Sequence, residues 1–334
     1  MAVNRKILLV QRPVEMFTDA CFEVVEEKIP EPGAGEAVVK LEYLSLDPAM
    51  RGWARDERSY LPPVPIGDVM RSGAAGRIVA SNNPSFPVGT GVMGLLGWQE
   101  YAVIGGASGV LANPLPEGIE LIDSLSLFGS TGVTAYIGMT EIGQAKAGET
   151  VVVSGAAGGV GSVAGQVAKI LGCRVVGIAG TKEKCSWVVD ELGFDACIDY
   201  KEGDVAQRLG EVCPEGIDVY FDNVGGDILD AALQHMNDFG RLVECGMISA
   251  YNDREPVPGP KHMTNIVTRR LRMQGFIVID HLAQFAEAAI QLGTWAAEGK
   301  IKNRVHVVDG FLSAPSAVNL LFTGGNVGKL VVKV

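Results

Sequence analysis

Hydrophobic and polar residues follow two different patterns along the chain. Up to about residue 123, short apolar runs alternate with Pro and Gly turns, and helical periodicity is scarce. The clearest strands predicted in this part cover residues 37–44, 76–80, 91–95 and 100–104. Short strands joined by such turns indicate a partly open β-barrel.

From about residue 124, the pattern changes to alternating strands and helices. The predicted strands cover residues 151–154, 174–180, 196–199, 218–221, 241–245 and 272–278. The predicted helices start at Val160 and cover 205–213, 227–236 and 282–298. In the first helix, apolar residues recur at spacings of three and four, at Val163, Ala164, Val167, Ile170 and Leu171. Six strands in βα repeats predict an α/β fold, a Rossmann doubly wound parallel sheet.

The end of the chain returns to a strand pattern. Residues 329–334 are mostly apolar and β-branched, and we expect them to rejoin the first domain and close it. The predicted organisation is therefore a first domain of residues 1–123 and 305–334, and an inserted dinucleotide-binding domain of residues 124–304.

A glycine loop follows the first strand of the second domain. Residues 151–161 read VVVSGAAGGVG, and Ala156, Gly158 and Gly161 occupy the three positions of the G-x-G-x-x-G fingerprint. The first position is an alanine, and Gly155 directly precedes it. A strand, a glycine loop and a helix in this order place a pyrophosphate on the helix N-terminus, where unpaired N–H groups and the helix dipole favour negative charge.

The end of the next strand predicts which dinucleotide is bound. An NAD-binding protein usually carries Asp or Glu there, to accept hydrogen bonds from the ribose. This chain has Gly180, Thr181, Lys182 and Lys184 instead. A lysine binds a 2′-phosphate that a carboxylate would repel, so the sequence favours NADPH over NADH. The alternative is that these lysines only cap a solvated helical turn.

Composition and charge exclude several classes of partner. The chain has 334 residues, of which 43 are glycine and 47% are hydrophobic, which indicates a folded protein with a sizeable core. A net charge of −11 without an offsetting basic cluster argues against a nucleic-acid partner. Residues 151–168 lack charge, but five glycines, two serines and a glutamine argue against a membrane helix. The N-terminal segment has no secretory signal, so we expect a cytoplasmic protein.

Cysteine and histidine positions argue against a metal site. The six cysteines form no C-x-x-C pair, and the four histidines are equally scattered. Structural zinc needs closely spaced thiolates, and catalytic zinc needs at least three convergent ligands. We therefore predict no metal, and cysteines that are mostly small core residues in a reducing compartment.

A β-barrel domain before and after an inserted dinucleotide fold resembles the medium-chain dehydrogenase/reductase superfamily. Motifs spread over the whole chain resemble its zinc-independent double-bond reductases, which include prostaglandin, leukotriene, 2-alkenal and curcumin reductases. These motifs are SLDPAMRG at 45–52, PIGDVM at 65–70, GVTAY at 132–136, YFDNVGG at 220–226, CGMISAYN at 245–252 and GNVGK at 325–329. The resemblance implies a GroES-like first domain and NADPH as the cofactor.

The resemblance also implies roles for individual residues. Lys184 matches the lysine that holds the 2′-phosphate, with Lys182 as an additional charge, and Tyr200 matches a tyrosine beside the adenosine ribose phosphate. Asn223 follows the fourth strand, at the carboxyl edge where ligands bind in such sheets. The alternative is that Asn223 only suits the turn before Gly225 and Gly226. The remaining cofactor residues implied are Thr134, Ala156, Ala157, Gly158, Gly159, Val160, Gly161, Gly180, Thr181, Cys245, Gly246, Met247, Ile248, Ser249, Phe276, Ile277, Val278 and Asn326.

The substrate side departs from the family pattern at one position. Many relatives carry a tyrosine within the D-P-x-M-R motif, where this chain has Ala49. The missing tyrosine widens or reshapes the pocket that the resemblance implies, and removes one candidate proton donor. Met50 and Tyr60 are further candidates to line the substrate, and a core position is the alternative for both.

The reaction implied is hydride transfer from NADPH to the β-carbon of an α,β-unsaturated aldehyde or ketone. Negative charge then develops on the carbonyl oxygen, and a hydrogen-bond donor must stabilise it. Tyr251 is the predicted protein donor beside the cofactor ribose, because a phenol donates without carrying charge. The alternative is that Tyr251 only packs or caps a loop. Cys245 is expected to pack against the cofactor, since no histidine lies near it in sequence to activate it.

Two other functions remain open from the sequence. An NADPH:quinone reductase would use the same cofactor residues and form a hydroquinone, and a non-catalytic NADPH-binding protein would show no turnover. The last strand, 272–278, is expected at the edge of the sheet, where a second subunit can pair with it. We therefore expect a homodimer.

Overall fold

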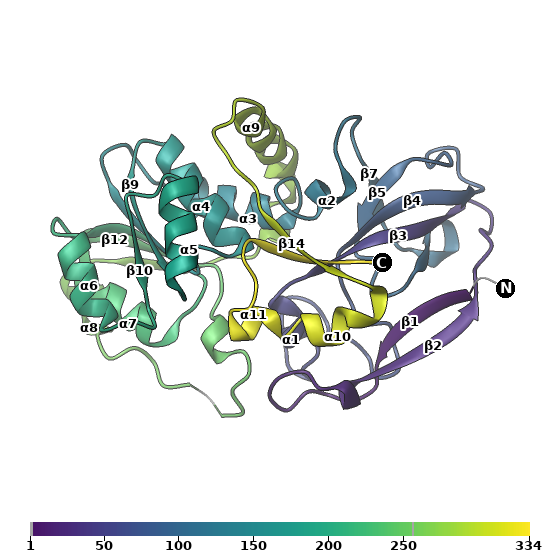
Figure 1. Ribbon diagram of the computed structural model, residues 1–334, viewed down its shortest axis with the longest axis horizontal. Helices are drawn as coiled ribbons and strands as arrows, with labels where there is room; N and C mark the ends of the chain where they lie inside the picture. The colour runs from purple at the N-terminus through teal and green to yellow at the C-terminus, as the bar shows by residue number, and fades with distance from the viewer. Residues whose placement is uncertain (1–2, 256) are drawn as a thin grey trace. The chain divides into compact units, whose positions relative to one another are not determined.

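The computed structural model describes residues 3–255 and 257–334 and divides into two compact units (Figure 1). The first unit runs to Leu125 and adds Val305–Asn326 and Leu330–Val334. The second unit comprises Ser126–Arg304 and Val327–Lys329. Residues 1 and 2, which belong to the expected first domain, lie outside the described residues, as does residue 256.

The first unit is built on antiparallel strands. The strand order in its main sheet is β14-β15-β3-β4-β5-β7, with β6 paired to β3, while β1 and β2 pair with each other. This path does not close within the described residues, which agrees with a partly open barrel. The strands are β1 (Val3–Leu9), β2 (Phe22–Lys28), β3 (Glu36–Leu46), β4 (Ala74–Ser81), β5 (Gly91–Gly94), β6 (Tyr101–Gly105), β7 (Ala112–Pro114), β14 (Val305–Asp309) and β15 (Lys329–Lys333).

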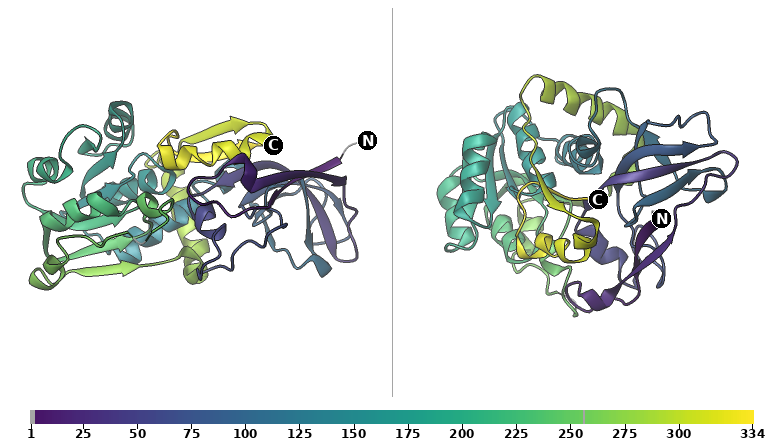
Figure 2. Two further views of the ribbon diagram at one scale, coloured as in Figure 1. Left: turned by 90° about the horizontal axis from the view of Figure 1, so that it is seen from below. Right: turned by 45° about the vertical axis from the view of Figure 1, so that its right-hand side comes forward.

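The C-terminal strand rejoins the first unit, as the sequence predicts. β15 pairs antiparallel with β3, and Leu330 lies opposite Leu46. Figure 2 shows this C-terminal strand, in yellow, returning to the first unit. Both residues belong to one hydrophobic core, which also contains Leu41, Trp98 and Phe311. Short helices complete this unit: η1 (Asp19–Cys21), α1 (Ala49–Trp53), η2 (Gly106–Ser108), α2 (Leu121–Ser124), η7 (Phe311–Ser313), α10 (Ala314–Ala317) and α11 (Leu320–Thr323).

The second unit contains the predicted parallel sheet. Its strand order is β10-β9-β8-β11-β12-β13, and the neighbours pair in parallel. Counted along the chain, this order is 3-2-1-4-5-6, which is the Rossmann arrangement. The strands are β8 (Thr150–Ser154), β9 (Arg174–Ala179), β10 (Ala196–Asp199), β11 (Ile217–Asp222), β12 (Met236–Glu244) and β13 (Arg272–Gly275).

Helices cover both faces of this sheet, which explains its continuous apolar strands. Val151 and Val153 of β8 face one hydrophobic cluster, and Val152 between them faces another. The helices are α3 (Ser130–Ile137), η3 (Gly138–Ile142), α4 (Gly159–Ile170), α5 (Lys182–Ser186), η4 (Trp187–Glu191), α6 (Val205–Val212), α7 (Gly226–His235), η5 (Ile248–Ala250), α8 (Thr264–Thr268), η6 (Val278–Gln284) and α9 (Phe285–Ala297). None of the helices in the described part of the chain combines the length and apolar character that crossing a membrane requires.

One predicted strand is too long. The strand expected at 272–278 ends at Gly275, and η6 begins at Val278. Phe276 turns into the hydrophobic cluster instead, where its ring lies 2.9 Å from the position that a Cβ on Gly138 would take. The apolar run therefore continues past the strand because it packs against a helix, and hydrophobicity alone does not distinguish the two.

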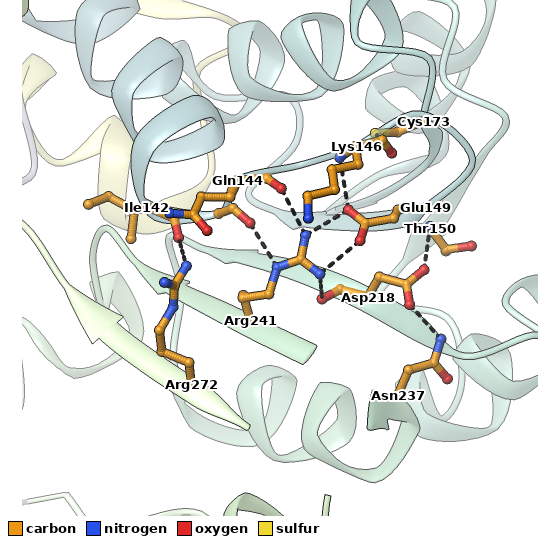
Figure 3. A network of polar contacts seen from close by, with 11 residues as sticks. Ile142, Gln144, Lys146, Glu149, Thr150, Cys173, Asp218, Asn237, Arg241 and Arg272 are labelled. Atoms are coloured by element: carbon orange, nitrogen blue, oxygen red, sulfur yellow. Dashed lines mark hydrogen bonds and ion pairs between the residues drawn. The ribbon is translucent and has the colours of Figure 1, made fainter. Parts of the chain in front are cut away.

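A network of polar contacts lies at the side of the sheet where the strands begin (Figure 3). The guanidinium of Arg241 donates to both carboxylate oxygens of Glu149, at 3.0 and 2.6 Å, and to the carbonyl oxygens of Gly143 and Gln144. Burial would raise the pKa of Glu149, but the bonds and charge of Arg241 hold it below its usual value. We call this side the amino edge.

Candidate active site

The opposite side of the parallel sheet, the carboxyl edge, contains the switch point of the fold. From β8 the chain moves outward through β9 and β10, then crosses to β11, β12 and β13 on the other side. Ligands of doubly wound sheets bind outside the carboxyl ends of the strands at this point.

The loop after β8 makes a left-handed turn and brings its backbone close to α4. The turn is at Gly155, with φ +59°. A Cβ on Gly161 would lie 2.3 Å from the carbonyl oxygen of Gly155, so a side chain there would force the helix away from the loop. Because the left-handed residue is Gly155, an alanine fits at the first fingerprint position. The methyl of Ala156 is buried against Gly177.

The N-terminus of α4 opens toward this edge. The helix starts after Gly158, and no side chain of the described residues caps it. Such a terminus attracts anions through its N–H groups and its dipole. The side chains of Thr131 and the buried Lys329 lie 3.0 and 3.5 Å from the position of a Cβ on Gly159. Both come from distant parts of the chain, and the expected Thr134 lies one turn further along α3.

Two lysines and a tyrosine meet beyond the ends of β9 and β10. Burial and the charge of Lys201 lower the pKa of Lys184. The ammonium of Lys201 lies 6.0 Å from the ring centroid of Tyr200. That ring covers Gly180, where a Cβ would lie 2.8 Å from it. Two cations that repel each other favour a dianionic group between them, and a phosphate monoester has that charge.

The other lysine expected here has a different position. Thr181 caps α5, since its hydroxyl oxygen accepts a hydrogen bond from the backbone N–H of Lys184 at 3.2 Å. Lys182 lies in the first turn with an exposed side chain. We therefore define the lysine pair as Lys184 and Lys201. Sequence reasoning missed Lys201, although it directly follows the predicted Tyr200.

Asn223 holds the end of β11 against the glycine loop. Its Nδ2 donates to the carbonyl oxygen of Ser154 at 2.7 Å, and its backbone N–H donates to the Ser154 hydroxyl at 2.8 Å. The Cβ of Asn223 lies 3.4 Å from the position of a Cβ on Gly155. The buried Asp222 accepts from the Ser154 hydroxyl at 2.7 Å and fixes the turn after β11. Asn223 therefore lies at the switch point.

The segment after β12 runs beside that turn. Ile248 donates its N–H to the carbonyl oxygen of Asn223 at 3.2 Å. Ser249 donates its N–H and its hydroxyl to the carbonyl oxygen of Val224, at 3.1 and 2.6 Å. The residues expected along the nicotinamide, from Cys245 to Ser249, thus form one ordered segment at the carboxyl edge.

Tyr251 folds back onto this segment. Its phenol oxygen accepts a hydrogen bond from the N–H of Met247 at 3.2 Å and lies 3.1 Å from the position of a Cβ on Gly246. Burial raises the pKa of Tyr251, so the phenol keeps its proton at neutral pH. A hydroxyl that accepts a hydrogen bond becomes a better donor. Tyr251 is therefore a protonated, polarised phenol at this edge.

An acidic side chain without a partner precedes the segment. Glu244 lies opposite Asp222 in the sheet, and neither of its carboxyl oxygens has a hydrogen-bond partner among the described residues. Burial and the charge of Asp222 raise the pKa of Glu244 to about 8. Burial likewise raises the pKa of Cys245 to about 12. Cys245 is therefore a thiol at neutral pH, which suits packing rather than nucleophilic attack.

The remaining cofactor candidates lie in different surroundings. Phe276 meets His281 edge-on, with ring centroids 6.3 Å apart. Ile277 and Val278 follow in partly buried positions. Asn326 is buried in the first unit. The cofactor roles that the resemblance implies for these residues stay predictions.

The substrate candidates belong to the first unit. Met50 is completely buried in its hydrophobic core, which favours the core role over pocket lining. Ala49 is partly buried at the start of α1. Tyr60 is 42% exposed, and its hydroxyl accepts a hydrogen bond from the indole N–H of Trp53 at 3.0 Å. Tyr60 is therefore the most accessible of the three.

No group of three His, Cys, Asp or Glu side chains is arranged to hold a metal ion within residues 3–255 and 257–334. The polar groups of the carboxyl edge fit a dinucleotide instead: an uncapped helix terminus for a pyrophosphate, and the lysine pair for a further phosphate.

Comparison with known proteins places the chain in a family. Residues 5–111 match the model described as the N-terminal domain of oxidoreductase, and residues 159–295 match the model described as zinc-binding dehydrogenase. The chain is 42% identical to the NADPH-dependent curcumin reductase of Escherichia coli, over 99% of this chain and 97% of that protein. It is 40% identical to prostaglandin reductase 1 of Bos taurus, over 95% and 94%.

A solved structure agrees with these matches. CurA from Vibrio vulnificus in complex with NADPH superposes with a TM-score of 0.93 at 42% identity, covering 99% of both chains. The chain therefore belongs to the medium-chain dehydrogenase/reductase superfamily, in the group of oxidoreductases that includes the curcumin and prostaglandin reductases.

Proposed function

We propose that this chain uses NADPH to reduce the carbon–carbon double bond of α,β-unsaturated aldehydes and ketones. The observation that carries the proposal is the lysine pair, on the same carboxyl edge as the glycine loop and Tyr251. The names of the relatives support the choice of reaction, since they include an NADPH-dependent curcumin reductase and a prostaglandin reductase.

The fit of NADPH to this edge rests on charge and space. The N-terminus of α4 would hold the pyrophosphate, with Gly155 and Gly161 allowing close approach of the backbone. Lys184 and Lys201 would hold the 2′-phosphate. Asn223 and the segment from Cys245 to Ser249 would line the nicotinamide half. When bound, NADPH supplies the hydride that the β-carbon of the substrate accepts.

Tyr251 would stabilise the charge that this reaction creates. Hydride addition to the β-carbon moves negative charge onto the carbonyl oxygen of the substrate, as an enolate. Tyr251 donates its O–H toward that oxygen, while the N–H of Met247 donates to the phenol oxygen. One preorganised donor of this kind contributes about 3 kcal/mol to the transition state. Solvent delivers the final proton to the α-carbon.

The experiment that tests the proposal follows NADPH oxidation with a 2-alkenal, curcumin and a quinone in turn, identifies each product by mass, and repeats the set with NADH. A saturated carbonyl product with NADPH is the expected result. Hydroquinone as the only product would replace the proposal with a quinone reductase. NADPH binding without any turnover would replace it with a non-catalytic binding protein.

The variant Tyr251→Phe separates the catalytic role from packing. It keeps the ring and removes the donor, so we expect kcat to fall by roughly a hundredfold or more, with little change in NADPH affinity. An unchanged kcat would assign Tyr251 to packing alone.

We propose that the enzyme is a homodimer, with residues 124–304 as the dinucleotide-binding domain and residues 1–123 and 305–334 as the substrate domain. Support for the dimer comes from β13, which ends the strand order of the parallel sheet and pairs with β12 on one side. Light scattering on the purified protein tests it, and a monomer at working concentration would reject it.

A further inference from the structure

Two cysteines that the proposed reaction does not use lie together behind the lysine pair. Cys185 is on α5, directly after Lys184, and Cys197 is on β10. Their thiols form a hydrogen bond with each other. Both side chains pack against the same hydrophobic cluster and are partly accessible.

The backbone explains why the two sulfur atoms meet. Cys197 pairs with Gly177 in the sheet, and its Sγ lies 3.2 Å from the position that a Cβ on Gly177 would take. Cys185 lies in the first turns of α5, where its N–H donates to the carbonyl oxygen of Thr181 at 2.9 Å. Its thiol accepts a hydrogen bond from the backbone of Ala179, two residues beyond Gly177 on β9. Both sulfur atoms therefore lie over the same end of β9.

The two thiols differ in a way that suits stepwise oxidation. The hydrogen bond from Cys197 lowers the pKa of Cys185, against the effect of burial, and raises the pKa of Cys197. A thiolate is the reactive form, so Cys185 is the attacking sulfur and Cys197 the resolving one. Burial raises the pKa of Cys173 and Cys213, each to about 11.

We propose that Cys185 and Cys197 form a reversible disulfide when the protein meets a hydroperoxide, and that this bond weakens NADPH binding. The Cys185 thiolate attacks one peroxide oxygen and the O–O bond breaks, which leaves a sulfenic acid on Cys185 and releases water or an alcohol after protonation. The Cys197 sulfur then attacks the Cys185 sulfur, the S–O bond breaks, and a second water leaves. The two cysteines lose two electrons and the peroxide gains them.

The effect on the cofactor follows from the position of Lys184. A disulfide holds its sulfur atoms about 2 Å apart, closer than a hydrogen bond between thiols. Forming it draws α5 toward β10 and moves Lys184 relative to Tyr200 and Lys201. This step rests on the proposed function, because it assumes that the lysine pair binds the 2′-phosphate of NADPH.

A mass measurement tests the disulfide without any cofactor. Trypsin cleaves after Lys184 and Lys201, so one peptide, residues 185–201, contains both cysteines. After hydrogen peroxide and then iodoacetamide, we expect this peptide to be unalkylated and lighter by two hydrogens than the reduced form. Dithiothreitol before alkylation should restore two alkylated cysteines. Two alkylated cysteines after peroxide treatment would overturn the proposal.

Affinity measurements test the coupling to NADPH. We expect peroxide to weaken NADPH binding by about tenfold or more in the wild type, reversibly with dithiothreitol. Cys185→Ser and Cys197→Ser should bind NADPH as the reduced wild type does, before and after peroxide, whereas Cys213→Ser should lose affinity like the wild type. If a serine variant fails to fold, Cys185→Ala replaces it. A disulfide with unchanged affinity would overturn the coupling, and no NADPH binding by the reduced wild type would instead reject the proposed function.

Discussion

Polar groups are arranged in opposite ways at the two edges of the parallel sheet. At the amino edge, Arg241 and Glu149 satisfy each other at 2.6 Å, with side chains only 15% and 22% exposed (Figure 3). At the carboxyl edge, Lys184 and Lys201 repel each other, and the carboxyl of Glu244 has no hydrogen-bond partner among the residues described. Opposite charges therefore neutralise each other where the strands begin, whereas like charges lie near each other where they end.

This difference separates stability from function within one sheet. Paired, partly buried charges need nothing from outside, and removing one partner destabilises the fold because the other charge is left uncompensated. Repelling cations and an uncapped helix terminus cost stability unless a ligand compensates for them, which is typical of binding sites. Substitutions at the amino edge should thus change folding alone, and substitutions at the carboxyl edge should change NADPH binding.

Gly161→Ala should cause the largest loss of stability and of NADPH affinity, because it disturbs the backbone at the carboxyl edge. The new Cβ would lie 2.3 Å from the carbonyl oxygen of Gly155, so α4 and the glycine loop must separate. Overpacking of this kind costs about 3 kcal/mol, and we expect NADPH affinity to fall with it. Gly52→Ala is the matched control, because nothing lies within 4 Å of its Cβ position. Urea unfolding and NADPH titration of both variants measure the difference, and equal losses would contradict it.

Lys184→Ala should lower affinity while leaving the fold intact. The variant removes one charge-assisted contact to the 2′-phosphate, worth about 2 kcal/mol, so NADPH affinity should fall roughly thirtyfold and NADH affinity should hardly change. Lys182→Ala, an exposed lysine of the same helix, should have little effect. Titration of both variants with NADPH and NADH decides the point. A larger loss in Lys182→Ala would exchange the roles of the two lysines.

Arg241→Gln should have the opposite effect to Lys184→Ala: it should lower stability and leave NADPH affinity unchanged. It leaves Glu149 partly buried without its cation, and we expect the free energy of unfolding to fall by about 2 kcal/mol with NADPH affinity unchanged. Arg208→Gln is the control, since Arg208 and Glu211 form an exposed pair at 3.5 Å that contributes little. Chemical unfolding and NADPH titration would show the contrast. A loss of NADPH affinity in Arg241→Gln would mean that the two edges are coupled.

The sequence predicts the carboxyl edge only where its determinants are local. The glycine loop, Lys184 and Tyr200 follow directly on strands, so their positions come from strand order alone. Thr131 and Lys329 are not predicted as site residues, because contacts between distant segments bring them to Gly159. No local pattern carries that information.

Hydrophobic patterns predict burial better than they predict the partner. The apolar run at 272–278 leads to too long a strand because Phe276 packs beside Gly138 rather than in the sheet. Met50 lies in a motif associated with substrate, yet its side chain is completely enclosed in the core. In both cases the sequence identifies an apolar residue, and only the tertiary contacts decide what it faces.

Glu244→Gln should give the smallest effect and isolates the cost of a carboxyl group at the carboxyl edge. The folded protein raises the pKa of Glu244 to about 8, while an unfolded Glu titrates near ~4.3. Between these values the folded state holds the extra proton, so Glu244 removes stability progressively as pH rises from about 4 to about 8. A neutral Gln avoids this cost, so we expect it to stabilise the protein by about 1 kcal/mol at pH 8 and by almost nothing near pH 4. Urea unfolding at both pH values measures it, with the exposed Glu215→Gln as control. A gain in stability that does not depend on pH would show that the charge of Glu244 does not destabilise the folded protein.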